Sequence, residues 1–211
     1  MTMISAVEAL DRLREGNRRF TSNNLQHCSI PAIQTHLNEL VAGQEPFAII
    51  LGCADSRVPA EIIFDQGLGD LFDIRVAGNI VTPSQVGSAE FAAKRFGTRL
   101  VVVLGHSGCG AVSATLEELK NPTEVLSPHL RMIVNRIRPA VEGILDSKPE
   151  RNGDTLLKQA VRSNIRASVN HLRNESQILR ELMENSGLIV VGAEYSVKTG
   201  IVDFFDSFNE E

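Results

Sequence analysis

The chain has 211 residues, 43% of them hydrophobic and 22% charged, and a formal net charge of −5. This length favours one substantial core over two ordinary domains, so we expect residues 1–211 to form a single domain. An acidic balance without a basic cluster or any Trp argues against a nucleic-acid partner. No apolar run is long enough to cross a membrane. With three Cys and no visible secretory signal in residues 1–5, the sequence predicts a cytoplasmic protein.

The first 45 residues are predicted to form a helical arm. Ser5-Ala6-Val7-Glu8 has the form of a capping box at the start of a helix. The apolar residues that follow at helical spacing are Ala6, Leu10, Leu13 and Phe20. We expect this amphipathic helix to pack either on a neighbouring subunit or on its own core. A short helix is predicted over Ala32–Leu40, and Cys28 is interpreted as a structural or surface thiol.

Five apolar runs predict the strands of a sheet. The runs at 47–52 and 100–105 are continuous and rich in Ile and Val, which is typical of strands buried on both faces of a parallel sheet. The remaining runs lie at 71–75, 188–193 and 201–205. We expect the first four strands in chain order to be parallel and the last to be an antiparallel edge strand.

Helical patterns separate these runs. They cover 58–64, 82–96, 111–120, 127–143, a longer stretch after Asp154, and 176–185. Thr82-Pro83-Ser84-Gln85 combines a capping box with Pro at the first helical position, and Gly97 ends that pattern. Strands that alternate with helices predict a single α/β domain with a mostly parallel sheet flanked by helices.

Reactive side chains follow two of the predicted strands. Cys53-Ala54-Asp55-Ser56-Arg57 follows the run at 47–52, and His106-Ser107-Gly108-Cys109 follows the run at 100–105. Ligands of parallel sheets bind beyond the carboxyl ends of the strands, so we expect these segments at one edge. Thiolate, imidazole and carboxylate are the side-chain groups that bind zinc. The sequence therefore predicts a zinc site with Cys53, His106 and Cys109 as ligands and Asp55 as a candidate fourth ligand.

Arg57 suggests how such a site could change state. Four protein ligands close a zinc site, whereas three leave a position for water. A guanidinium can hold a carboxylate in a bidentate pair, so Arg57 could keep Asp55 off the metal and leave that position open. Zinc lowers the pKa of bound water from about 15.7 to about 7. The pattern therefore favours hydration or hydrolysis of a small electrophile.

Three segments, in their order and spacing, resemble the β-class carbonic anhydrases: Cys53–Pro59, Arg75–Asn79 and Gly105–Gly110. The resemblance runs from about Phe47 to Phe205. It implies Cys53, His106 and Cys109 as permanent zinc ligands and Asp55 with Arg57 as a catalytic dyad. It also implies attack of zinc hydroxide on CO2 to give bicarbonate and a proton. The implied assembly is a homodimer, often paired into a homotetramer, with each active site near the dimer interface.

The resemblance assigns two further residues to the substrate. Gln66 matches a Gln that, in the plant-like subgroup, is donated across the dimer interface to help hold substrate, and Gly110 would offer its N–H to substrate. Ile50 stands where one bacterial subgroup with a regulatory bicarbonate pocket carries Trp, so we do not expect that pocket in its usual form. Tyr195 and His129 are candidates for a proton shuttle by residue type alone.

Three other interpretations remain open at this point. An enzyme of the same fold could hydrolyse carbonyl sulfide or carbon disulfide with the same zinc ligands. A serine hydrolase could place Ser107 at a strand-to-helix turn, although the G-x-S-x-G pattern would need Gly in place of Cys109. A non-catalytic homologue could use zinc for stability alone, with Cys53, Asp55, His106 and Cys109 as a closed set.

Overall fold

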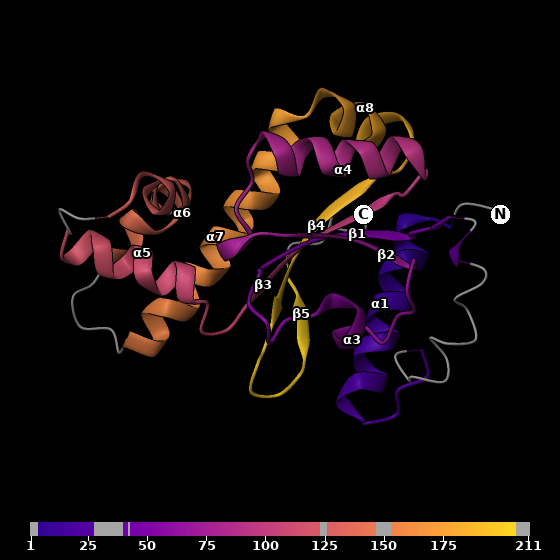
Figure 1. The fold of residues 1–211 in the computed structure, drawn as a ribbon, viewed down its shortest axis with the longest axis horizontal. Helices are drawn as coiled ribbons and strands as arrows, with labels where there is room; N and C mark the ends of the chain where they lie inside the picture. Colours follow the sequence, from indigo (N-terminus) through magenta and orange to yellow (C-terminus); the bar gives the residue numbers. More distant parts are fainter. Residues whose placement is uncertain (1–3, 28–39, 42, 123–125, 147–152, 206–211) are drawn as a thin grey trace.

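Two fully buried strands, β1 (Ala48–Gly52) and β3 (Leu100–His106), lie side by side at the centre of a five-stranded sheet. The computed structural model describes residues 4–27, 40–41, 43–122, 126–146 and 153–205. Its strand order is β2-β1-β3-β4-β5 (Figure 1). The outer strands are β2 (Leu71–Arg75), β4 (Ile189–Tyr195) and β5 (Val202–Phe204). Four strands are parallel and β5 is antiparallel to β4, which confirms the predicted sheet.

Helices cover both faces of this sheet (Figure 1). One face carries α1 (Ala6–Thr21) and α3 (Ala60–Ile63); the other carries α4 (Pro83–Arg95), α7 (Gly153–Glu175) and α8 (Gln177–Asn185). Two helices, α5 (Gly110–Lys120) and α6 (Pro128–Asp146), pack beside α7, and a 3₁₀ turn, η1 (Ala77–Asn79), follows β2. None of the described helices is both long and apolar enough to cross a membrane.

The predicted helix ends agree with the local hydrogen bonds. The Ser5 hydroxyl accepts a hydrogen bond from the Glu8 N–H at the start of α1, and Thr82 and Gln85 form the predicted capping box of α4. Gly97 follows α4 with φ 72°, a left-handed conformation that suits Gly after a helix. The largest difference is in α6, which continues past 143 to Asp146, and α3 is shorter than the predicted 58–64. The predicted helix at 32–40 and the assignment of Cys28 lie outside the described residues, apart from Leu40 itself.

Helix α1 packs on its own core, which is one of the two arrangements expected from the sequence. Its buried residues Ala9 and Leu13 belong to the same apolar cluster as Phe47 of the strand entry and Ile50 of β1. A Cβ atom on Gly16 would come within 1.7 Å of the Phe64 carbonyl oxygen, so α1 touches the backbone just after α3. Glycine therefore permits the close approach of the two helices.

Asn17 connects α1 to two distant parts of the chain. Its amide nitrogen donates to the carbonyl oxygens of Ile63 and Gly200, and its amide oxygen accepts from the N–H of Val202. We expect Asn17→Ala to lower the free energy of unfolding by about 3 kcal/mol, because it leaves three backbone groups, in two buried bonds and one part-buried bond, without this partner. Urea denaturation measures the change. The exposed Asn24→Ala is the control, and an equal effect of the two substitutions would contradict the role of Asn17.

Candidate metal centre

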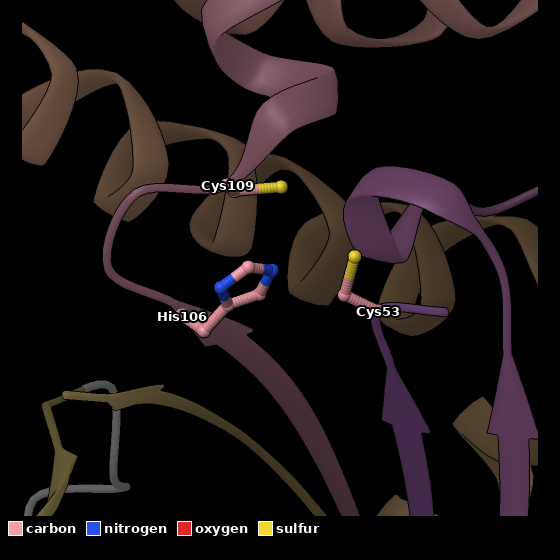
Figure 2. A group of neighbouring side chains, drawn as sticks. All are labelled: Cys53, His106 and Cys109. Atoms are coloured by element: carbon pink, nitrogen blue, oxygen red, sulfur yellow. The ribbon is translucent and has the colours of Figure 1, made fainter. Parts of the chain in front are cut away.

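Three of the predicted zinc ligands come together at the carboxyl ends of β1 and β3. Cys53 directly follows β1, His106 is the last residue of β3, and Cys109 caps the start of α5. Their ligand atoms all lie within 4.8 Å of one another, and all three residues are buried. Figure 2 shows the three side chains turned toward one another. The fold therefore gathers these side chains into a group that could hold a metal ion.

The His106 ring is oriented as a metal ligand needs to be. Its Nδ1 lies 3.1 Å from the carbonyl oxygen of Ser107, while its buried Nε2 has no hydrogen-bond partner among the described residues. A proton on Nδ1, donated to that carbonyl, leaves the Nε2 lone pair free toward the two sulfurs. Buried polar atoms without a partner are rare in folded proteins, so the free lone pair of Nε2 fits the role of a metal ligand.

The two thiols differ in how readily they lose a proton. The pKa of Cys53 is held well below its ordinary value, chiefly by the hydrogen bond from the Cys109 thiol and despite the opposing effect of burial. The same contact, together with burial, raises the pKa of Cys109. The backbone N–H of Gly78 also donates to the Cys53 sulfur, at 3.4 Å. One thiolate therefore forms readily, and thiolate is the form that binds metal.

Asp55 lies beside this group but is bonded to Arg57. The guanidinium donates to both carboxylate oxygens, with Nε–Oδ1 2.9 Å and Nη2–Oδ2 2.7 Å, and the Arg57 backbone N–H adds a third bond at 3.0 Å. These contacts keep the pKa of Asp55 below its usual range. Asp55 Oδ2 is 3.8 Å from His106 Nε2. An ionised carboxylate therefore faces the ligand group while Arg57 holds it.

The two residues assigned to the substrate lie in different places. Gly110 is exposed and begins α5 directly after Cys109, so it lies beside the group. Gln66 is buried; its Nε2 donates to the Phe64 carbonyl at 2.6 Å, and its Oε1 accepts from Arg12. Arg12 also lies over Phe47, at the opposite end of β1 from Cys53. A single chain therefore does not bring Gln66 to the Cys-His-Cys group.

Comparisons with known proteins identify the family. A model of the carbonic anhydrase family matches residues 48–202. Carbonic anhydrase 2 of Mycobacterium tuberculosis is 38% identical over 200 residues, which cover 95% of this chain and 93% of that protein. This chain belongs to the β-carbonic anhydrase family.

Solved β-carbonic anhydrases have the same fold. An enzyme of Aspergillus fumigatus superposes with a TM-score of 0.73 at 25% identity, covering 95% of this chain and 90% of that one. A structure from a study of two tetrameric enzymes of Sordaria macrospora gives a TM-score of 0.70 at 25% identity. The match covers 81% of this chain and 86% of that one. The chain is thus a carbonic anhydrase, a family whose general reaction is CO2 hydration, as the sequence motifs predicted.

The geometry of this carbonic anhydrase does not fit a serine hydrolase. The Ser107 hydroxyl oxygen accepts a hydrogen bond from the N–H of Val197 at 3.0 Å, which ties the turn after β3 to the loop after β4. His106 turns Nδ1 toward the Ser107 carbonyl and Nε2 toward the sulfurs, so its ring does not serve the Ser107 hydroxyl as a base. Ser107 therefore has a structural role in the turn.

The two proton-shuttle candidates also differ in position. Tyr195 of β4 stands opposite His106 in the β3–β4 pairing, is buried, and has a pKa raised by that burial. His129 lies on the surface near the start of α6. Tyr195 is therefore paired in register with one member of the Cys-His-Cys group, whereas His129 is exposed.

Several residues that build the centre were given no role from the sequence. Arg75 donates from Nε to the Cys53 carbonyl at 3.2 Å and from Nη2 to the Asp55 carbonyl at 2.7 Å, which fixes the loop after β1. Asn164 and Ser168 of α7 donate to the carbonyl oxygens of the η1 turn. In the sequence, only their spacing hints at such a role, because these two polar residues lie four positions apart beside the apolar stripe of α7.

Asp73 of β2 is a partly buried carboxyl near this loop. Burial and the neighbouring Glu61 raise the pKa of Asp73 to about 7, although Arg75 opposes the shift. Between about pH 4 and pH 7 the unfolded chain loses this proton while the folded chain keeps it, so the free energy of unfolding falls as pH rises through this range. Above about pH 7 this contribution no longer changes.

We therefore expect Asp73→Asn to remove this pH dependence. The free energy of unfolding of the variant minus that of wild type should rise by about 3–4 kcal/mol from about pH 4 to about pH 8. Urea denaturation at the two pH values measures the difference, with the exposed Asp11→Asn as control. If the variant and wild type differ in free energy of unfolding by the same amount at both pH values, Asp73 does not carry this proton.

Proposed function

We propose that this carbonic anhydrase catalyses the reversible hydration of CO2 to bicarbonate and a proton, with one zinc ion bound by Cys53, His106 and Cys109. The observation that carries the proposal is the position of Asp55. Its carboxylate lies beside the ligand group, 3.8 Å from His106 Nε2, yet both of its oxygens are held by Arg57. With Asp55 held in this way, the fourth ligand position could be taken by a water molecule.

The donor set supports zinc as the metal. Two thiolates and one imidazole suit zinc, with bonds of about 2.0–2.3 Å, so tetrahedral ligands stand about 3.5–3.8 Å apart. The ligand atoms here lie within 4.8 Å of one another, so the side chains would need to move by no more than about 1 Å. When bound, zinc supplies a Lewis acid that makes water acidic enough to act as a nucleophile near neutral pH.

Asp55 and Arg57 are proposed to orient the attacking water. The Asp55 carboxylate, kept ionised by Arg57, can accept a hydrogen bond from that water and direct a lone pair toward CO2. Arg57 also prevents Asp55 from becoming a fourth ligand, which would displace the water. The backbone N–H of Gly110, at the exposed start of α5, is the proposed contact for a substrate oxygen.

The assembly and location are part of the proposal. The related Sordaria macrospora enzymes are described as tetrameric, which supports a homodimer that pairs into a homotetramer here. A site built on thiols needs reducing surroundings, which favours the cytoplasm. Gln66 is proposed to help hold substrate across the dimer interface. This role would require a second copy of the chain, because within one chain Gln66 bonds to Arg12 and Phe64.

The dyad can be tested with two variants and one control. Asp55→Asn and Arg57→Gln should each lower kcat/KM for CO2 hydration by at least about 100-fold, because the water is no longer oriented. Stopped-flow measurement of CO2 hydration gives the rates. Asp11→Asn is the matched control, because Asp11 also pairs with an Arg, Arg14, but on the surface of α1.

Zinc content is measured alongside by mass spectrometry. We expect about one zinc per chain in wild type and in Asp55→Asn, and loss of zinc and activity in Cys109→Ser. Undiminished hydration in Asp55→Asn would overturn the role of Asp55. Carbonyl sulfide hydrolysis faster than CO2 hydration in wild type would replace the proposed substrate, and absence of zinc from active protein would overturn the metal assignment.

A further inference from the structure

We propose that Asn164 and Ser168 of α7 are positioning residues of the metal site, which hold the η1 turn so that its Gly78 N–H points at the Cys53 sulfur. The inference rests on the proposed metal site but concerns residues that touch neither metal nor substrate. It assigns to α7 the task of fixing one ligand atom through a chain of two hydrogen bonds.

The turn that donates to Cys53 has an unfavourable backbone conformation. Gly78 has φ 69° and Asn79 has φ 43°, so two consecutive residues lie in the left-handed region. Glycine adopts this region at little cost, whereas Asn79 is one of the few non-glycine residues that do so in the described parts of the chain. Such a conformation persists only where the surroundings fix it. The Gly78 N–H therefore needs external support to keep its direction.

Helix α7 supplies that support through side chains one helical turn apart. Asn164 Nδ2 donates to the Gly78 carbonyl at 2.8 Å, and Ser168 Oγ donates to the Asn79 carbonyl at 2.9 Å. Both side chains are buried, with 2% and 5% of their surface exposed. The peptide groups on both sides of Asn79 are thus held from one helix face. Polar groups that are this buried and bonded restrict the turn strongly.

The same helix face also contacts the strand that carries His106. Ile165, which lies between the two polar residues, packs so closely on Gly105 that a Cβ atom there would come within 2.5 Å of the Ile165 side chain. Gly78 is packed from the other side, since a Cβ there would meet Ile137 of α6 at 2.8 Å and Ala111 of α5 at 3.1 Å. Helix α7 therefore contacts both the turn that donates to the Cys53 sulfur and the strand that carries His106.

The consequence for the metal follows from the hydrogen bond to sulfur. An N–H that donates to a thiolate withdraws charge from the sulfur and fixes its direction, and outer hydrogen bonds of this kind typically change metal affinity by about 10–100-fold. Loss of either α7 bond frees the turn and weakens the Gly78 contact with Cys53. The Cys53 sulfur would then carry more charge, which lowers the energy of charge transfer to a bound metal. It would also be less firmly directed, which weakens metal binding.

The test uses Co²⁺ as a spectroscopic probe and zinc affinity as a second measurement. Ser168→Ala and Asn164→Leu should shift the thiolate-to-cobalt charge-transfer band to longer wavelength. They should also weaken zinc binding, in competition with a chelator, by about 10-fold or more. Ser168→Thr, which keeps the hydroxyl, should restore both properties toward wild type.

Ser163→Ala is the matched control, because Ser163 lies on the same helix and donates to the Ala140 carbonyl at 2.6 Å, away from η1. It should leave the cobalt band and the zinc affinity unchanged. If Ser168→Ala and Asn164→Leu match wild type, or if Ser163→Ala shifts the band equally, the inference is overturned while the metal site stands. If wild-type protein binds neither Co²⁺ nor zinc, the proposed function fails as well.

Discussion

The ion pair between Asp55 and Arg57 is the interaction on which the proposed chemistry depends. The guanidinium donates to both carboxylate oxygens, and the Arg57 backbone N–H donates a third hydrogen bond to Asp55 Oδ1. Without this pair, an ionised carboxylate so close to His106 would be free to complete a closed tetrahedral site. An exposed ion pair contributes little to stability, so its significance lies in where it holds the carboxylate.

The rest of the fold serves to bring the three proposed ligands beside that pair. The central strands β1 and β3 are parallel neighbours, so residues that follow them emerge at the same edge of the sheet. Arg75 fixes the loop after β1, Ser107 fixes the turn after β3, and α7 holds the η1 turn between them. Rigid elements thus position ligands whose own side chains are short.

The sheet, its strand directions and the Cys-His-Cys group were predictable from the sequence, because apolar runs mark the strands locally and the three side chains follow two of those runs. The contacts of Gln66 and the position of α1 were not, since both depend on long-range packing between α1, α3 and β2. Asn164 and Ser168 were missed for the same reason. A polar residue beside an apolar stripe does not reveal which carbonyl it will meet across the core.

The most direct test of the account is a crystal structure of the purified protein at mildly alkaline pH, with anomalous scattering measured at the zinc edge. The account predicts one zinc ion bound by Cys53, His106 and Cys109, with Asp55 still bonded to Arg57. A structure in which Asp55 binds the ion at that pH, or in which active protein carries no ion at the three side chains, would contradict it.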